Sequence, residues 1–320
     1  MYQETKRWLS LAALLVVIGL AMFSAVMIVY GWDFTKLSTV TYETNTYEPS
    51  GAFSSISINT NTADIIFMTA EDGKCRVVCY EAEKAKHSVD VQDAILTINE
   101  MNEKKWYDHI GISIGTPKIT VYLPDTKYDV LTVRERTGDI EIPEAFHFES
   151  IDVSTSTGDV KNYASATGEI QIKTSTGNIC VERIAAGGID LSVSTGGIVV
   201  SHVTCEGDVT IKVSTGKTNM TDIACKNVIS NGSTGNLFLK NVIALEQFSI
   251  QRSTGKVSFD VCDASEIFVE TDTGDVTGTL LSEKTFFAES RMGNVDVPQN
   301  TTGGRCEIKS GTGDIELEIP

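Results

Sequence analysis

Cysteine and histidine are the residues of this chain that could ligate a metal ion or serve as nucleophile and base. The chain has seven cysteines and four histidines, and the histidines are His87, His109, His147 and His202. No Cys-x-x-Cys pair occurs, which disfavours a zinc site, and the histidines are scattered along the sequence. We therefore predict no catalytic residue, no metal site and no cofactor.

Cys205 and Cys225 are the most regularly placed cysteines, because each follows the glycine of a recurring Thr-Gly pair by nine residues. In other copies of the repeat the same position holds alanine, as at Ala186, which indicates a column of small interior residues. We expect both thiols to pack as small apolar side chains. The alternative is a disulfide between them, since stacked coils would place their Cα atoms about 5 Å apart.

Acidic residues after the recurring glycines raise the question of calcium. Asp139 and Asp159 follow the glycine in adjacent copies, and Asp-bearing turns of some solenoids bind this ion. The equivalent residues elsewhere are Gly197, Lys217 and Lys256, so the carboxylates do not form an unbroken column. Calcium binding by the first pair stays an alternative.

The Thr-Gly pair, or a near variant of it, recurs ten times at intervals of 19 or 20 residues, and this period predicts a solenoid. Glycine suits a turn that needs positive φ, and the threonines before it could form a hydroxyl ladder. One threonine is replaced by Met292. The predicted turn residues are Thr137, Gly138, Thr157, Gly158, Thr176, Gly177, Thr195, Gly196, Thr215, Gly216, Thr234, Gly235, Thr254, Gly255, Thr273, Gly274, Gly293, Thr312 and Gly313.

Apolar residues alternate with polar ones on both sides of each glycine, as Ile151, Val153 and Val160 do around Gly158. This period of two predicts two short strands per coil, and no segment of the repeat region keeps a helical period. Because equal positions of successive coils would stack as parallel strands, we predict an all-β parallel β-solenoid with 19–20 residues per coil over residues 131–320. Parallel crossovers are strongly biased to the right hand, so we expect a right-handed solenoid.

The segments that flank the regular repeats have their own expected roles. We expect residues 33–50 to form a stem and residues 51–130 to form irregular solenoid coils that cap the core. At the other end, Glu316, Glu318 and Pro320 are residue types that discourage pairing between exposed strand edges. We therefore expect the last residues of the chain to protect the end of the rod.

The N-terminal segment has the length and composition of a membrane anchor. From Trp8 to Trp32 there are 25 residues without a charge, enough for a helix that crosses a bilayer. Lys6 and Arg7 precede it, so the positive-inside rule places the N-terminus in the cytoplasm and the solenoid outside. We predict a cytoplasmic stub and transmembrane signal anchor over residues 1–32, with a cleaved signal peptide as the alternative.

The chain carries 26 basic and 43 acidic residues, a net charge of −17. Nucleic acids and anionic lipid headgroups are bound through clustered cations, so this balance argues against both as partners. The expected contact with a membrane is therefore through the N-terminal helix alone.

Three sequence features resemble a bacterial family of β-strand-repeat proteins of unknown function known as putative adhesins. They are the Ala63-Asp64-Ile65 segment, the Val121-Tyr-Leu-Pro124 segment and repeats such as Ser156-Thr-Gly-Asp159. The resemblance covers residues 51–320 and implies a β-helical module on the bacterial cell surface. Some members of that family sit beside cell-envelope stress systems, and the family has no motif-defined site to transfer.

Taken together, these features predict a single-pass protein of the bacterial cell membrane whose extracytoplasmic solenoid binds an envelope or extracellular protein or glycan without catalysis. Its context would be adhesion or envelope-stress signalling. One alternative is an enzyme acting on polysaccharide, which would need carboxylates paired across a groove. Another is a structural spacer that associates end to end.

Overall fold

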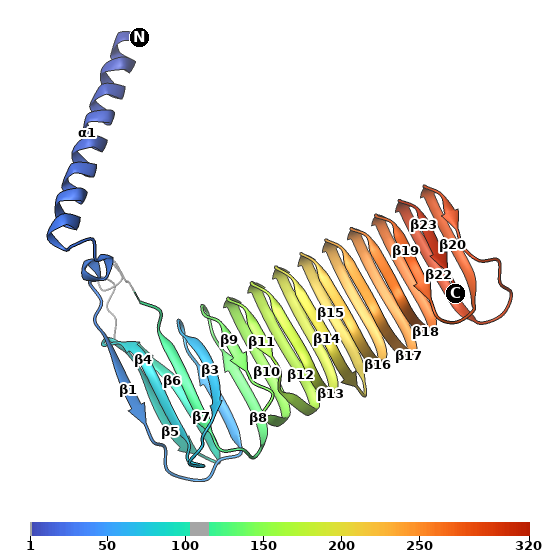
Figure 1. The fold of residues 1–320 in the computed structure, drawn as a ribbon, viewed down its shortest axis with the longest axis horizontal. Coiled ribbons are helices and arrows are strands. Elements are labelled where there is room, and N and C mark those ends of the chain that lie inside the picture. Colours follow the sequence, from blue (N-terminus) through green and yellow to red (C-terminus); the bar gives the residue numbers. More distant parts are fainter. Residues whose placement is uncertain (1, 103–114) are drawn as a thin grey trace.

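The computed structural model describes residues 2–102 and 115–320 and consists of one N-terminal helix followed by a long β-structure (Figure 1). Helix α1 (Tyr2–Val29) is followed by a short 3₁₀ helix, η1 (Phe34–Leu37). Within α1, residues Lys6–Val29 have a mean hydropathy of 2.8. By length and composition this helix can cross a membrane, as a signal sequence near the N-terminus also can.

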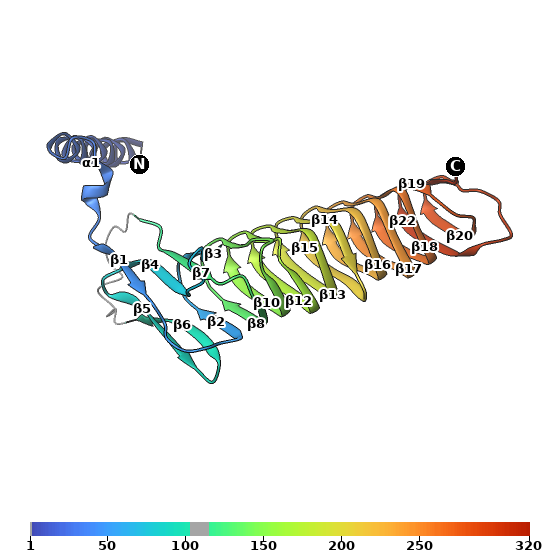
Figure 2. The same cartoon turned by 60° about the horizontal axis from the view of Figure 1, so that its bottom comes forward.

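Seven strands at the N-terminal end form what we term the cap. They are β1 (Tyr42–Tyr47), β2 (Ser55–Asn59), β3 (Asp64–Thr69), β4 (Arg76–Ala82), β5 (Ala85–Gln92), β6 (Ile95–Asn102) and β7 (Lys118–Leu123). Strands β6 and β7 pair in parallel with β2 and β3, respectively. Antiparallel strands then cover the end, since β5 pairs with β6, β4 with β7, and β1 with β4 (Figure 2).

The remaining strands stack in parallel and form what we term the solenoid. They are β8 (Lys127–Arg134), β9 (Ile140–Ile142), β10 (His147–Thr157), β11 (Val160–Asn162), β12 (Ser165–Thr176), β13 (Ile179–Thr195), β14 (Ile198–Cys205), β15 (Asp208–Thr215), β16 (Thr218–Thr234), β17 (Leu237–Thr254), β18 (Val257–Thr273), β19 (Val276–Leu280), β20 (Lys284–Met292), β21 (Val295–Asp296), β22 (Gly304–Thr312) and β23 (Ile315–Glu318). Equivalent repeat positions are direct partners, as Thr157 is of Thr176. The predicted parallel β-solenoid is confirmed.

Each coil turns at two corners, of which the sequence indicated one. The first is the predicted glycine turn; at Gly158 φ is +143°, and a Cβ would lie 1.9 Å from the carbonyl oxygen of Gly138. The second corner lies six residues later and has φ between +50° and +56° in non-glycine residues, namely Arg183, His202, Asp222, Asn241 and Val261. Because pairing continues through this corner in β13, β16, β17 and β18, the two predicted short strands of each of those coils form one strand of 17 or 18 residues.

A single apolar core runs through the cap and the solenoid, from Ile56 to Leu317. The alternating inward positions predicted around each glycine supply it, and Ile151, Val153 and Val160 are all 0–1 % exposed. Stacking equal side chains in register gives each coil the same apolar neighbours above and below.

At both ends of the rod the spatial order of the coils differs from their order in the sequence. At the C-terminal end β22 pairs with β18 on one side and with β20 on the other, and β23 lies between β19 and β21. The outermost coil is therefore residues 284–296, and the expectation that Glu316 and Glu318 protect the end is wrong. Both residues lie in a strand that is paired on both edges, because repeat spacing fixes how coils stack but not which coil is last.

Candidate functional site: a polar groove on the solenoid

The solenoid carries a polar groove of about 440 Å³ on the outer face of strands β13, β15, β16, β17 and β18. Residues four and two positions before each turn glycine point outward and form its walls, while the inward residue between them forms its floor. The wall residues are Ser192, Ser194, Lys212, Ser214, Asn231, Ser233, Gln251, Ser253, Glu270 and Asp272. The repeat therefore builds the groove, with a serine two positions before the glycine in four of its five strands.

The walls of the groove offer hydrogen-bond donors and acceptors at the spacing of stacked strands. Hydroxyl and amide groups dominate, with one cation at Lys212 and carboxylates at Glu270 and Asp272. A second hollow shares Asn231, Gln251 and Glu270 with the groove and adds the half-buried ring of Phe268. Polar groups repeated every ~4.8 Å beside an aromatic ring suit an extended polar ligand.

The floor of the groove contains a charged residue that the repeat pattern did not predict to be inside. Arg252 is 1 % exposed, and its Nη2 donates a hydrogen bond of 2.7 Å to Ser230 Oγ. Its Nε and Nη1 have no hydrogen-bond partner among the described residues, and burial lowers the pKa of the guanidinium to about 10. Gly232 leaves room for it, since a Cβ there would lie 1.7 Å from Arg252 Nη1.

The sequence held a signal for this buried arginine. Ser230 interrupts a column that is otherwise apolar, Gly232 is the only glycine in the column two residues further on, and Arg252 is the in-register partner of Gly232. A small residue followed by a large one in the same inward column indicates that the large side chain fills the space.

The predicted turn residues lie in one column along an edge of the rod, where backbone groups and Asp or Asn side chains connect them. The Gly158 N–H donates to the Thr176 carbonyl oxygen at 2.9 Å, and the same bond recurs along the column. Within the described residues no hydroxyl–hydroxyl hydrogen bond joins the turn threonines.

The acidic residues after the glycines have a role that sequence reasoning missed. Asp139 Oδ1 accepts a hydrogen bond of 2.8 Å from the Asp159 N–H, and Asp159 Oδ1 accepts one of 2.7 Å from the Asn178 N–H. Asn178 Oδ1 in turn accepts from the Gly197 N–H at 2.9 Å. This ladder explains why Asp and Asn share the position, and it occupies one oxygen of each carboxylate that was considered for calcium.

Cys205 and Cys225 are both buried and are both free thiols. Their Sγ atoms contact backbone carbonyls, that of Asp208 for Cys205 and that of Ile243 for Cys225. Burial raises the pKa of the Cys225 thiol to about 12, so it stays protonated at neutral pH. Both thiols lie in the column of small side chains that Ala186 shares.

The three histidines that the structure describes do not form a common site. His147 and His202 are exposed on the solenoid, and His109 lies outside the described residues. His87 differs, because it is buried among polar side chains in the cap.

Comparison with known proteins places these features in a family. The family model described as Toastrack DUF4097 matches residues 53–212 and 206–320, in agreement with the resemblance inferred for residues 51–320. No curated protein matches the chain significantly.

Among solved structures, a "putative adhesin" from Bacteroides fragilis NCTC 9343 is 15% identical with a TM-score of 0.44, over 87% of this chain and 97% of that chain. A "putative lipid binding protein" from Parabacteroides distasonis ATCC 8503 is 12% identical with a TM-score of 0.46, over 88% and 98%. A "putative adhesin" from Parabacteroides merdae ATCC 43184 is 12% identical with a TM-score of 0.40, over 88% and 98%. At these TM-scores the likenesses carry no functional conclusion for this chain.

Proposed function

This chain belongs to the Toastrack DUF4097 family, and on that premise we propose that it is a membrane-anchored, non-enzymatic binding module whose solenoid groove holds an extended neutral glycan. The observation that carries the proposal is the groove itself. It crosses five stacked strands, and its walls are built from side chains that form hydrogen bonds.

The chemistry of the groove favours a neutral polymer over a charged one. The net charge of −17 opposes polyanions, and within the groove the two carboxylates balance Lys212 and the buried Arg252, so no excess of either sign lines it. Hydroxyl and amide groups in neighbouring strands can exchange hydrogen bonds with the repeated hydroxyls of a sugar chain, and Phe268 offers a face for one ring.

The N-terminal helix supports a location at the cell envelope. A helix of this length and hydropathy suits a membrane anchor, and the positive-inside rule orients Lys6 and Arg7 toward the cytoplasm. In that orientation the solenoid lies outside the membrane, where it would meet envelope or extracellular glycans and could act in adhesion or envelope-stress signalling.

Binding of neutral polysaccharides to the full chain in detergent micelles tests the proposal, with purified peptidoglycan sacculi as a second probe. For any glycan that the native chain binds, we expect the double variant N231A/Q251A to bind at least about tenfold more weakly than the native chain, because it loses two amide groups of the groove. Asn219→Ala is the matched control, since Asn219 lies on the same strand β16, outside the residues that line the groove. Absence of binding by the native chain, or equal binding by the groove variant, would contradict the proposal.

The same assay separates binding from hydrolysis. Glu270 and Asp272 stand two residues apart on the same face of β18 and line the groove, and they are the pair that a polysaccharide hydrolase would use. Release of reducing ends by the native chain, and loss of that release in Glu270→Gln, would contradict the proposed binding role and show that the chain hydrolyses the polysaccharide. We expect no release.

A further inference from the structure

The cap encloses a cluster of polar side chains at the end of the apolar core. Strand β4 pairs with β7 and strand β5 pairs with β6, so the two strands belong to opposite sides of the core and meet at the tight connection between Ala82 and Ala85. Cys79 and Glu81 point inward from β4, and His87 points inward from β5. All three are 0–2 % exposed.

These three residues present three different ligand atoms to one point. A thiol sulfur, a carboxylate oxygen and an imidazole nitrogen all lie within 4.8 Å of one another. Around a tetrahedral Zn²⁺ ion, with bonds of about 2.0–2.3 Å, such atoms stand roughly 3.3–3.8 Å apart. The cluster therefore needs only small side-chain movements to surround an ion of that size.

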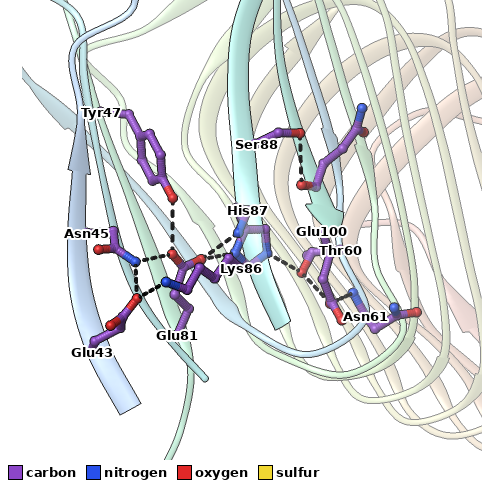
Figure 3. A network of polar contacts seen from close by, with 11 residues as sticks. Glu43, Asn45, Tyr47, Thr60, Asn61, Glu81, Lys86, His87, Ser88 and Glu100 are labelled. Carbon is purple, nitrogen blue, oxygen red and sulfur yellow. Dashed lines mark hydrogen bonds and ion pairs between the residues drawn. The ribbon is translucent and has the colours of Figure 1, made fainter. Parts of the chain in front are cut away.

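The atoms of His87 and Glu81 that would not face the ion are held by neighbouring side chains (Figure 3). His87 Nε2 lies 2.9 Å from Thr60 Oγ1, and Glu81 Oε1 accepts hydrogen bonds from Asn45 Nδ2 at 2.7 Å and from the Tyr47 hydroxyl at 3.2 Å. Metal-binding histidines and carboxylates in proteins are oriented by such outer contacts.

The imidazole and the carboxylate meet at one place in the cluster. His87 Nδ1 lies 2.6 Å from Glu81 Oε2, and the same oxygen accepts a hydrogen bond of 2.7 Å from the His87 backbone N–H. On the other side of the ring, His87 Nε2 contacts the Thr60 hydroxyl, which also lies 3.4 Å from Glu100 Oε2. The ligand atoms of His87 and Glu81 therefore face each other inside the cluster.

The nearby thiol and the charge of the ligands suit a divalent ion. Glu81 pairs with His87 inside the cluster, whereas Lys86 is directed to Glu43 and is 41% exposed. A divalent ion with one carboxylate and one thiolate forms a neutral group, which is the favourable state in a buried site. Such an ion would engage the Cys79 sulfur together with His87 and Glu81.

We propose that Cys79, Glu81 and His87 bind a divalent transition-metal ion of the Zn²⁺ class, which joins β4 to β5 and closes the cap. Thiolate, imidazole and carboxylate together match the preference of this ion. Three protein ligands leave one position for a water molecule. The role is structural, since the burial of all three ligands leaves no approach for a substrate.

A catalytic role for the same residues is excluded by burial. Thr60, His87 and Glu81 follow the order hydroxyl, imidazole, carboxylate that acyl-transfer enzymes use. Thr60 is only 3 % exposed, so no substrate reaches its hydroxyl.

Titration of the metal-stripped full chain in detergent micelles with Co²⁺, followed by competition with Zn²⁺, tests the proposal. We expect one equivalent of Co²⁺ to bind with tetrahedral d–d bands and a thiolate-to-cobalt charge-transfer band, and Zn²⁺ to displace it. Cys79→Ser and His87→Gln should lose the charge-transfer band and weaken binding by at least about 100-fold, because each removes a ligand. Thr60→Ala, which removes an outer contact, should weaken binding by about 10- to 100-fold.

Cys75→Ser is the matched control, because Cys75 precedes the same strand and is not part of the cluster. It should bind Co²⁺ as the native chain does, and circular dichroism reports whether each variant is folded. A folded native chain that shows no charge-transfer band overturns the proposal, as does a Cys79→Ser variant that binds like the native chain. If both ligand variants fail to fold, the spectrum of the native chain decides alone.

Discussion

The solenoid and the cap share one apolar core but specify their residues in different ways. In the solenoid the surroundings of a side chain follow from its repeat position, so Ile170 stacks on Ile151 and Ile189, and the turns from Gly138 to Gly274 repeat the same hydrogen bond. In the cap the strands run antiparallel at the end of the rod, and a buried group such as Glu81 has partners that occur once in the chain.

This difference indicates which parts of a repeat protein are suited to hold a functional site. A side chain in a regular column has neighbours of its own kind, which favours packing over reactivity. The buried polar groups with unusual surroundings occur where the repeat is absent, as at His87, or interrupted, as at Arg252. The following changes test this contrast, from the largest expected effect to the smallest.

Replacing a turn glycine should disrupt the solenoid most. In Gly216→Ala the new Cβ would lie 1.8 Å from the Gly196 carbonyl oxygen, and φ is +152°. We expect a loss of about 3–5 kcal/mol in the free energy of unfolding, measured by chemical denaturation. Gly188→Ala is the control, since no atom lies within 4 Å of its Cβ position. A small effect of the turn substitution would mean that the repeat does not fix the turns.

Where the cap meets the first regular coil, Glu135 should make stability depend on pH. Burial raises the pKa of its carboxyl to about 8 from an ordinary value of 4.5. The folded state therefore holds a proton that the unfolded state loses between these values, so the stabilisation is complete below pH 4.5 and is lost as the pH rises through 8. Glu135→Gln should raise the free energy of unfolding by about 2 kcal/mol at pH 8 and change it little at pH 4.

The exposed Glu169→Gln provides the comparison for that measurement, with an expected change within about 0.5 kcal/mol at either pH. Equal pH profiles of the native chain and Glu135→Gln would rule out this explanation.

Replacing Arg252, the buried arginine that interrupts an inward column of the solenoid, should restore regular apolar packing. In Arg252→Met the unpaired buried charge is replaced by an apolar chain, and we expect the free energy of unfolding to rise by about 1–2 kcal/mol. The gain should shrink as the pH rises above about 10, since the lowered pKa lets the folded state lose its proton before the unfolded state does.

Arg134→Met is the control for charge removal, because Arg134 lies at the surface in an ion pair with Asp152. Its effect should stay below about 1 kcal/mol. A large loss of stability in Arg252→Met would show instead that the guanidinium is required by the fold.

The smallest expected effect is at the second corner of a coil. Val261 has φ of +56°, a conformation that is costly for a β-branched residue, whereas Asn241 occupies the same corner one coil earlier. Val261→Asn should therefore raise the free energy of unfolding by about 1 kcal/mol. Val199→Asn, at an exposed strand position with no positive φ, should lower it, and the same sign for both would contradict the argument.

The same contrast explains how far the sequence could predict the structure. The ten glycines, spaced 19 or 20 residues apart, predict the column of turns, the parallel pairing and the inward-facing positions. All three follow from the position of a residue relative to the glycine of its coil. The second corner has no such signal, since Arg183, His202 and Val261 share a conformation but no side-chain type.

The structure of the cap and the order of the coils were harder to predict from the sequence, for related reasons. Glu81 and His87 do not occupy equivalent positions of a repeat. Their contact depends on the antiparallel pairing of β4 with β5, which residue spacing alone does not reveal. The prediction that no histidine binds metal was made from spacing, and the proposed site rests instead on proximity across the core. Likewise, equal repeats give no information on which coil lies outermost.

The position of residues 304–318 has a consequence for how the molecule comes apart. These residues follow the 284–296 coil in the sequence, yet they lie between that coil and the coil that contains β18. Strand β22 is bonded along both edges, so it cannot separate from the rod until the 284–296 coil has detached. The resistance of residues 304–318 to local unfolding therefore depends on a segment that precedes them in the sequence.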